Sequence, residues 1–178
     1  ALIGLQRAQG GPENSPVFLG GIAPDDYVAG ALGALGAIMA LYARERGGFG
    51  QQAHTSLLNA GILLSPREFM KFRGKPPRRH ADKGQHGLSA LHRLYETAEG
   101  WIYLAAESEQ FWPGLCGALD REDLASDPRF ASPNARAEND AALALELEQT
   151  LRGRASAEWL SALEEKEVPC APVIEGYG

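Results

Sequence analysis

A long run of small and apolar residues from Tyr27 to Tyr42 constrains the fold of this chain more than any other feature. Nearly every residue in the run is apolar, which predicts a helix that is buried on most of its faces. Gly30, Gly33 and Gly36 recur at every third position, although each glycine weakens a helix by about 1 kcal/mol relative to alanine. Their recurrence indicates that another backbone packs closely against this face, and we expect a tight helix crossing there.

We do not expect this helix to cross a membrane. The apolar run is shorter than the roughly 20 residues that a bilayer core requires, and it is rich in glycine and alanine. Arg44 and Arg46 follow at its C-terminal end, where the helix dipole favours cations.

Two adjacent carboxylates, Asp25 and Asp26, stand at the start of the same helix. A short side-chain oxygen there can accept a free backbone N–H of the first turn, so either residue fits the N-cap position. The positive end of the helix dipole would also stabilise an ionised carboxylate that is poised as a nucleophile. Residue chemistry alone leaves a cap and a reactive carboxylate as alternatives.

Hydrophobic period and the positions of proline and glycine predict the remaining elements. The predicted helices cover residues 27–46, 56–72, 109–119, 134–151 and 157–166, the last with Ser156 as its N-cap. The predicted strands cover residues 91–97, 101–105 and 168–174. This order predicts an α+β fold: a long helical arm and linker, residues 1–80, then a small domain, residues 81–178, with a short sheet flanked by helices.

Charge and composition exclude several classes of function. The net charge is −6 with both signs interspersed, which argues against a nucleic-acid partner. A basic segment from Arg67 to His80 fits either a solvated connector or a surface that faces phosphates. The four histidines form no pair at helical spacing and join no cluster of ligands, so we expect no metal. Cys116 and Cys170 are expected to be buried reduced thiols of a cytoplasmic protein.

Four segments in the same order resemble the family III CoA-transferases, a group that includes formyl-CoA transferase, carnitine CoA-transferase and the α-methylacyl-CoA racemases. The first runs from Asp26 through Gly30 to Gly50-Gln51, and the second is the hairpin that turns at Glu99-Gly100-Trp101. The other two read Asp-Pro-Arg-Phe at 127–130, followed by Arg136 and Asn139, and Val-Pro-Cys-Ala-Pro-Val at 168–173. The resemblance covers most of the chain.

The resemblance implies a reaction and a site. Asp26, four residues before Gly30, would be the catalytic carboxylate, and CoA would pass from an acyl-CoA to a carboxylic acid through an aspartyl-CoA intermediate. A turn made of Gly84, Gln85, His86 and Gly87 matches a glycine-rich loop that closes over the active site, although an ordinary turn fits these residues equally well. CoA thioesters would be substrates, with no tightly bound cofactor. Family members form interlocked homodimers and are about twice as long, so we expect a C-terminal portion that is inactive by itself.

Departures from the family pattern keep two other functions open. Phe49 stands where the family has arginine, and His54 where it has aspartate. Ser108 occupies the position of a glutamate found in the racemases, with Glu107 one residue away. The alternatives are a racemase that exchanges the α-proton of a 2-methylacyl-CoA, and a non-catalytic half that binds CoA or dimerises.

Overall fold

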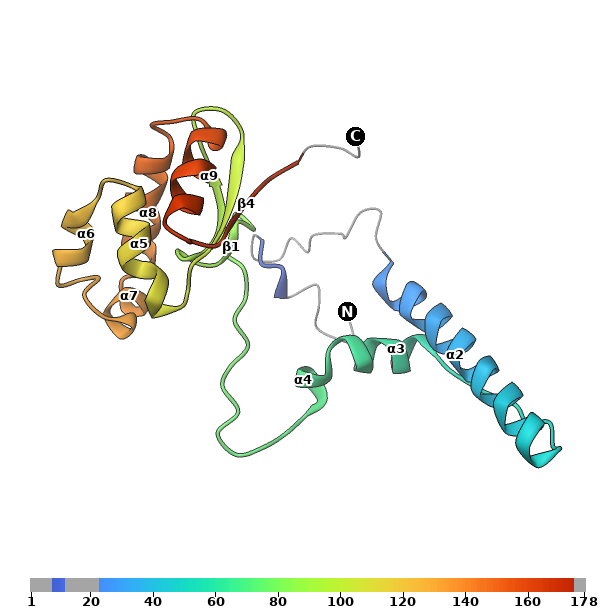
Figure 1. Ribbon diagram of the computed structural model, residues 1–178. Coiled ribbons are helices and arrows are strands. Elements are labelled where there is room, and N and C mark those ends of the chain that lie inside the picture. The colour runs from blue at the N-terminus through green and yellow to red at the C-terminus, as the bar shows by residue number, and fades with distance from the viewer. Residues whose placement is uncertain (1–7, 12–22, 175–178) are drawn as a thin grey trace. The chain divides into compact units, whose positions relative to one another are not determined.

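A computed structural model describes residues 8–11 and 23–174 of the chain (Figure 1). It divides into two units, Ala1–Arg78 and Arg79–Gly178, and each is described by itself. The first holds helices and a linker, and the second combines helices with a small antiparallel sheet, which confirms the predicted α+β class. The separate roles predicted for residues 1–80 and 81–178 stay a prediction.

The first unit is built on helix α2, Pro24–Gly47. Pro24 occupies the first helical position, where its missing N–H costs nothing. Ala23 is the N-cap and its side chain makes no capping bond, so the alternative in which Asp25 or Asp26 caps the helix is wrong. The helix ends at Gly47, and the C-cap residue Gly48 has a left-handed φ of 75° and donates its N–H to Arg44 O at 2.7 Å.

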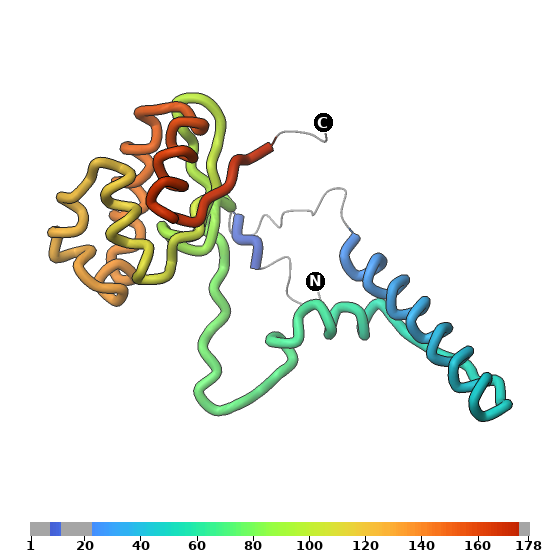
Figure 2. The backbone as a smooth tube through the Cα atoms, in the orientation of Figure 1, coloured from blue at the N-terminus to red at the C-terminus, as the bar shows by residue number. Residues whose placement is uncertain are grey.

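Two short helices follow, α3 at Leu57–Leu64 and α4 at Pro66–Phe69 (Figure 2). Ser56 caps α3, because its Oγ accepts the Asn59 N–H at 3.1 Å. The single helix predicted over residues 56–72 is therefore wrong. Pro66 lacks the N–H that would continue the first helix, and it starts the second.

The glycines of α2 meet an extended segment and not a helix. A Cβ at Gly36 would lie 3.1 Å from Ala53 Cβ, and one at Gly33 would lie 3.9 Å from Thr55 Cγ2. A Cβ at Gly30 would meet nothing within 4 Å. The predicted close approach is found at Gly36, but the neighbour is the chain that leads into α3.

No residue of α2 is buried within this chain, contrary to the expectation that most of its faces are covered. Large apolar side chains are more than half exposed along it: Tyr27, Leu35, Ile38, Met39, Leu41 and Tyr42. An 18-residue window of α2 reaches a mean hydropathy of 1.4. The length and composition of α2 therefore do not exclude a membrane span, contrary to the expectation from the sequence. Core helices of soluble proteins pass the same test.

The second unit contains a four-stranded antiparallel sheet in the order β1-β2-β3-β4. The strands are β1 Gly87–Ser89, β2 His92–Glu96, β3 Trp101–Ala105 and β4 Cys170–Pro172. Leu94 pairs with Tyr103 and Leu104 pairs with Cys170. The last strand is shorter than predicted, and β1 was not predicted.

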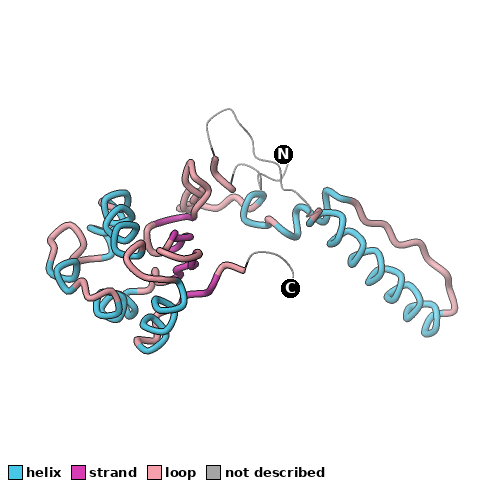
Figure 3. Tube along the Cα trace, turned by 90° about the horizontal axis from the view of Figure 1, so that it is seen from above, coloured by secondary structure: helices cyan, strands magenta, loops and turns pink. Residues whose placement is uncertain are grey.

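Helices gather on one side of this sheet (Figure 3). They are the 3₁₀ turn η1 at Glu109–Phe111, α5 at Trp112–Ala118, α6 at Glu122–Ser126, α7 at Pro133–Glu138, α8 at Asp140–Leu151 and α9 at Ser156–Glu165. Tyr95, Ile102 and Leu104 of the sheet are buried with Phe130 and Trp159 in one apolar core. The predicted helix over 134–151 breaks at Asn139. Ser156 is the first helical residue and not the cap, so that prediction is wrong.

Candidate active site

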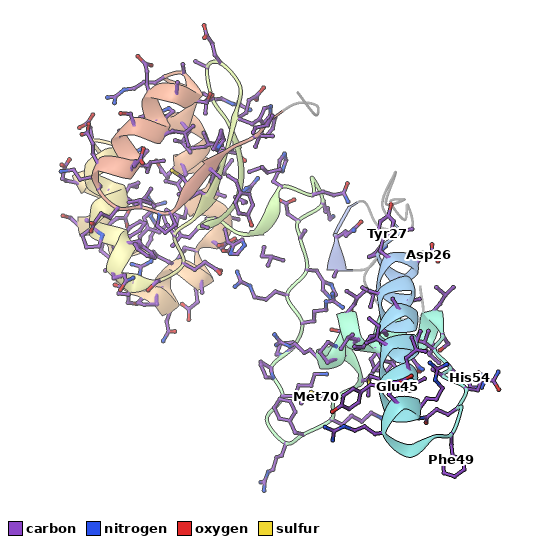
Figure 4. The ribbon with its side chains drawn as sticks, turned by 45° about the vertical axis from the view of Figure 1, so that its right-hand side comes forward. Asp26, Tyr27, Glu45, Phe49, His54 and Met70 are labelled. Carbon is purple, nitrogen blue, oxygen red and sulfur yellow. The ribbon has the colours of Figure 1, made fainter. Side chains whose placement is uncertain are left out.

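Asp26 lies in the first turn of α2, and Figure 4 shows it at the N-terminal end of this helix. Its side chain is exposed. Within the described part of the chain, no hydrogen bond or ion pair holds its carboxylate. The free amides of the first helical turn favour a negative charge at this place. The carboxylate is therefore exposed and has no partner among the described residues, as a nucleophile requires.

The neighbouring Asp25 is in a different environment. It is half-buried, and its Oδ1 atom has no accessible surface and no hydrogen-bond partner among residues 8–11 and 23–174. Of the two carboxylates at the start of α2, Asp26 is the more exposed.

The other end of α2 carries the residues that depart from the family pattern. Phe49 is 81% exposed, and Figure 4 shows it beyond the end of the helix, with His54 beside the helix. A shallow groove of about 510 Å³ lies along this end, lined by Ala37, Arg44 and Gln51 among others. Arg44 pairs with Glu45 at 3.0 Å, so its charge is already partly balanced.

The basic segment that follows is engaged within its own unit. The Arg67 guanidinium donates to Pro76 O at 3.3 Å, and Lys75 Nζ donates to Met70 O at 3.0 Å. Arg78 pairs with Glu68 at 2.9 Å. These contacts fold the linker back on α4, as a connector requires.

The turn of Gly84, Gln85, His86 and Gly87 belongs to the second unit. Gln85 has a left-handed φ of 60°, and its N–H donates to Asp82 O at 3.0 Å. The His86 ring stacks on Trp101, with centroids 6.0 Å apart and planes at 12°. In this structure the turn is well ordered by hydrogen bonds, and whether it closes over a substrate stays a prediction.

A second cluster, which the sequence did not reveal, surrounds Glu107. Its carboxylate accepts hydrogen bonds from Arg79 at 2.6 Å and Ser89 at 3.1 Å, and it lies 2.9 Å from His92 Nδ1. Burial raises the pKa of Glu107, but the bonds from Arg79, His92 and Ser89 outweigh it and hold the pKa below its usual value. These residues come from four separate segments, so no local spacing could have brought them together.

The Glu107 cluster borders a groove of about 520 Å³ with an apolar floor that includes Leu88, Leu91 and Leu143. Arg136, only 4% exposed, also lines it. Its guanidinium donates to Phe130 O at 2.7 Å, pairs with Glu109 and lies over the Trp112 ring at 4.5 Å. The charges in this groove already have partners from the same unit.

Thiols and metal ligands add no further chemistry. Burial raises the pKa of the Cys116 thiol to about 11 and also raises the pKa of Cys170, so both are poor nucleophiles at neutral pH. Both thiols are free. In the two described ranges, 8–11 and 23–174, no group of three or more His, Cys, Asp or Glu side chains could hold a metal ion.

The fold and the site define a class: an α+β protein with an accessible aspartate at the start of a long glycine-rich helix. The family model described as CoA-transferase family III matches residues 1–175, and the chain belongs to this family. The chain is 28% identical over 177 residues to the acetyl-CoA:oxalate CoA-transferase of Acetobacter aceti, covering 98% of this chain and 45% of that protein.

Two further comparisons agree. The chain is 30% identical over 175 residues to the succinyl-CoA:mesaconate CoA-transferase of Haloarcula hispanica, covering 97% and 43% of the two chains. The solved structure of a CAIB/BAIF family protein from Brucella suis matches with a TM-score of 0.79 and 25% identity, covering 98% of this chain and 46% of that one. The chain thus spans less than half the length of each of these relatives.

Proposed function

We propose that the protein carrying this chain transfers CoA from an acyl-CoA to a carboxylic acid, with Asp26 as the nucleophile. The observation that carries the proposal is the position of Asp26 in a chain of this family: it is exposed, it lies in the first turn of α2, and no residue in the ranges 8–11 and 23–174 engages its carboxylate. Relatives named as CoA-transferases support the reaction class.

The reaction is a sequence of acyl transfers at one carboxylate. An oxygen of Asp26 attacks the thioester carbonyl carbon, the C–S bond breaks, and CoA leaves as a thiolate while an acyl-aspartyl anhydride forms. The thiolate then attacks the Asp26 carbonyl, which releases the donor acid and leaves an aspartyl-CoA thioester. An acceptor carboxylate repeats both steps in reverse order, so a new acyl-CoA forms and Asp26 is regenerated.

A carboxylate suits this chemistry because an anhydride conserves the free energy of the thioester. Backbone N–H groups of the first turn of α2 are candidates to stabilise the oxyanion at Asp26. The turn of Gly84 to Gly87 is proposed to border an acyl-CoA substrate, as the resemblance to the family implies. CoA thioesters are substrates in this scheme, and no tightly bound cofactor is required.

The exposed apolar surface of α2 supports a homodimer in which another chain covers this helix, and the same cover makes a membrane unnecessary. The free thiols Cys116 and Cys170 support a cytoplasmic location. Neither a nucleic acid nor a membrane is a partner in this proposal.

The racemase alternative is less well supported by the structure. Glu107 and Glu109 both flank Ser108, which occupies the position of the racemase glutamate. Glu109 pairs with Arg136, and the oxygens of Glu107 already accept hydrogen bonds from Arg79 and Ser89. The lowered pKa of Glu107 also makes it a weak base. Solvent deuterium that enters the α-carbon of an acyl-CoA, without exchange of the acid, would reverse this preference.

The test is to trap the activated aspartate in the whole protein. The protein is incubated with a panel of acyl-CoAs, treated with hydroxylamine and digested, and the peptide containing Asp25 and Asp26 is analysed by fragmentation mass spectrometry. We expect a hydroxamate on Asp26, none in Asp26→Asn, and an unchanged amount in Glu45→Gln, a control at the far end of α2. A hydroxamate on Asp25, or none across the panel, would refute the assignment.

A further inference from the structure

Asp82 organises the turn that the proposed function places beside the substrate. Its Oδ1 accepts the His86 N–H at 2.7 Å, and its own N–H donates to Gly87 O at 2.9 Å. The Gln85 N–H donates to Asp82 O at 3.0 Å. These bonds tie Asp82 to Gln85, His86 and Gly87, so a contact that holds Asp82 also holds the turn.

Arg93 on β2 holds Asp82. Its Nη2 atom lies 3.3 Å from Asp82 Oδ2 and 3.1 Å from Glu148 Oε1 on α8. The Arg93 side chain is only 11% exposed, whereas those of Asp82 and Glu148 are 35% and 32% exposed, so water screens these charges in part. One guanidinium thus joins the turn, the sheet and helix α8.

Close packing against β2 also holds the turn in place. A Cβ on Gly87 would overlap Arg93 and the His92 carbonyl, so glycine is required where the turn meets β2. The Leu94 N–H donates to His86 O at 2.9 Å and adds a backbone bond to the same contact. The turn is fitted against Arg93 and the strand that carries it.

Charge balance makes this contact depend on the arginine. Asp82 and Glu148 each bring a negative charge to the single guanidinium of Arg93. Without it, these two partly exposed carboxylates would lose the cation that they share and would repel each other. Loss of Arg93 would therefore have two effects. It would remove the attraction that holds Asp82, and the repulsion from Glu148 would push Asp82 and its turn away from the sheet.

We infer that Arg93 is a positioning residue that fixes the turn of residues 82–87 through Asp82. Glu148 is the second carboxylate that pairs with the same guanidinium. The effect on catalysis rests on the proposed function, because it requires the turn to border the acyl-CoA. The effect on the turn does not.

Hydrogen exchange of the whole protein tests the structural half. In Arg93→Gln we expect the amides of Gln85, His86 and Leu94 to exchange about tenfold faster, while those of β3 keep their protection. Arg93→Gln combined with Glu148→Gln should recover part of the lost protection, because the repulsion between the carboxylates is gone. Arg152→Gln is the matched control, since Arg152 pairs with Glu96 at 3.0 Å in an exposed bridge at the end of the same strand.

Three results would overturn the inference. The turn amides of Arg93→Gln could keep their wild-type rates, or the amides of β3 could loosen as much as the turn, which would make Arg93 a general fold residue. The third result is that Arg93→Gln combined with Glu148→Gln exchanges its turn amides as fast as Arg93→Gln alone.

Kinetics separate this inference from the proposed function. In the whole protein, Arg93→Gln should lower kcat about tenfold with a smaller change in KM, and Arg93→Lys should recover part of it because the charge returns. Faster turn exchange with full activity would uphold Arg93 as the positioning residue and remove the turn from the catalytic site. A missing hydroxamate on Asp26 would remove the proposed reaction and leave the exchange result standing.

Discussion

Single buried polar side chains fix much of the second unit, and Arg136 is the clearest case. It is only 4% exposed, and its guanidinium satisfies the Phe130 carbonyl while it pairs with the half-exposed Glu109. We expect Arg136→Met to cost about 2–4 kcal/mol of unfolding free energy, because a buried carbonyl loses its donor. Chemical denaturation of the protein followed by tryptophan fluorescence measures this.

The contrasting variant is Glu109→Gln. Its side chain is exposed and its loss leaves the bond from Arg136 to Phe130 intact, so we expect a smaller cost of about 1 kcal/mol. Equal costs for both variants would show that the ion pair, and not the bond to the carbonyl, dominates.

The Glu107 cluster predicts a pH dependence of stability. The pKa of Glu107 is lowered in the folded protein, so its contribution is complete above the unfolded value of 4.5 and is lost as the pH falls through the folded pKa. Glu107→Gln should therefore be less stable than the wild type at pH 7, and the difference should shrink below pH 4.5. Denaturation midpoints of both proteins across this range provide the test. A difference that grows on acidification would contradict the assignment.

At the scale of elements, the glycines of α2 differ in what they tolerate. Gly33→Ala meets only an ordinary contact and should stabilise the helix by about 0.5–1 kcal/mol, because alanine is the better helix former. Gly36→Ala places its methyl 3.1 Å from Ala53 and should lose that gain. Thermal melting compares the two variants.

Gly30→Ala extends this comparison to surfaces that cover α2 in the assembled protein. Nothing within this chain lies within 4 Å of the added methyl, so the chain alone predicts a gain like that at Gly33. A marked loss at Gly30 alone would show that another backbone packs there.

Long elements could be predicted from the sequence, and their interruptions could not. The strand at Trp101–Ala105 was predicted with its observed bounds, because a short run of apolar and aromatic residues follows a clear glycine turn. Pro66 separates α3 from α4, but the apolar periodicity across it led to the prediction of one helix. The break at Asn139 and the short strand β1 depend on tertiary contacts, which no local pattern encodes.

The candidate site divides in the same way. Asp26 is predicted from its resemblance to a family motif that lies within one continuous segment, from Asp26 to Gln51. The Glu107 cluster and the bridge from Asp82 through Arg93 to Glu148 join segments up to 66 residues apart, so only the fold reveals them. Asp26 as nucleophile stays a prediction until the trapping experiment is done.

For the whole molecule, the two units differ in how far they can stand alone. The second has a buried core around Tyr95, Phe130 and Trp159, whereas α2 in the first buries none of its residues. We expect residues 79–178 expressed alone to unfold cooperatively, since about 100 residues with one core suffice. Residues 1–78 alone should expose apolar surface and associate.

Calorimetry and sedimentation of the two pieces provide the test. A cooperative, monomeric unit from residues 1–78 would contradict this expectation. It would also weaken the case that another chain covers α2.

The exposure of Asp26 has one more consequence. An acyl-aspartyl anhydride open to bulk water is hydrolysed, so an uncovered Asp26 would waste thioesters as a thioesterase does. In the proposed reaction, any surface that covers this aspartate would therefore set the ratio of transfer to hydrolysis. The fidelity of the enzyme would lie in its cover and not in its nucleophile.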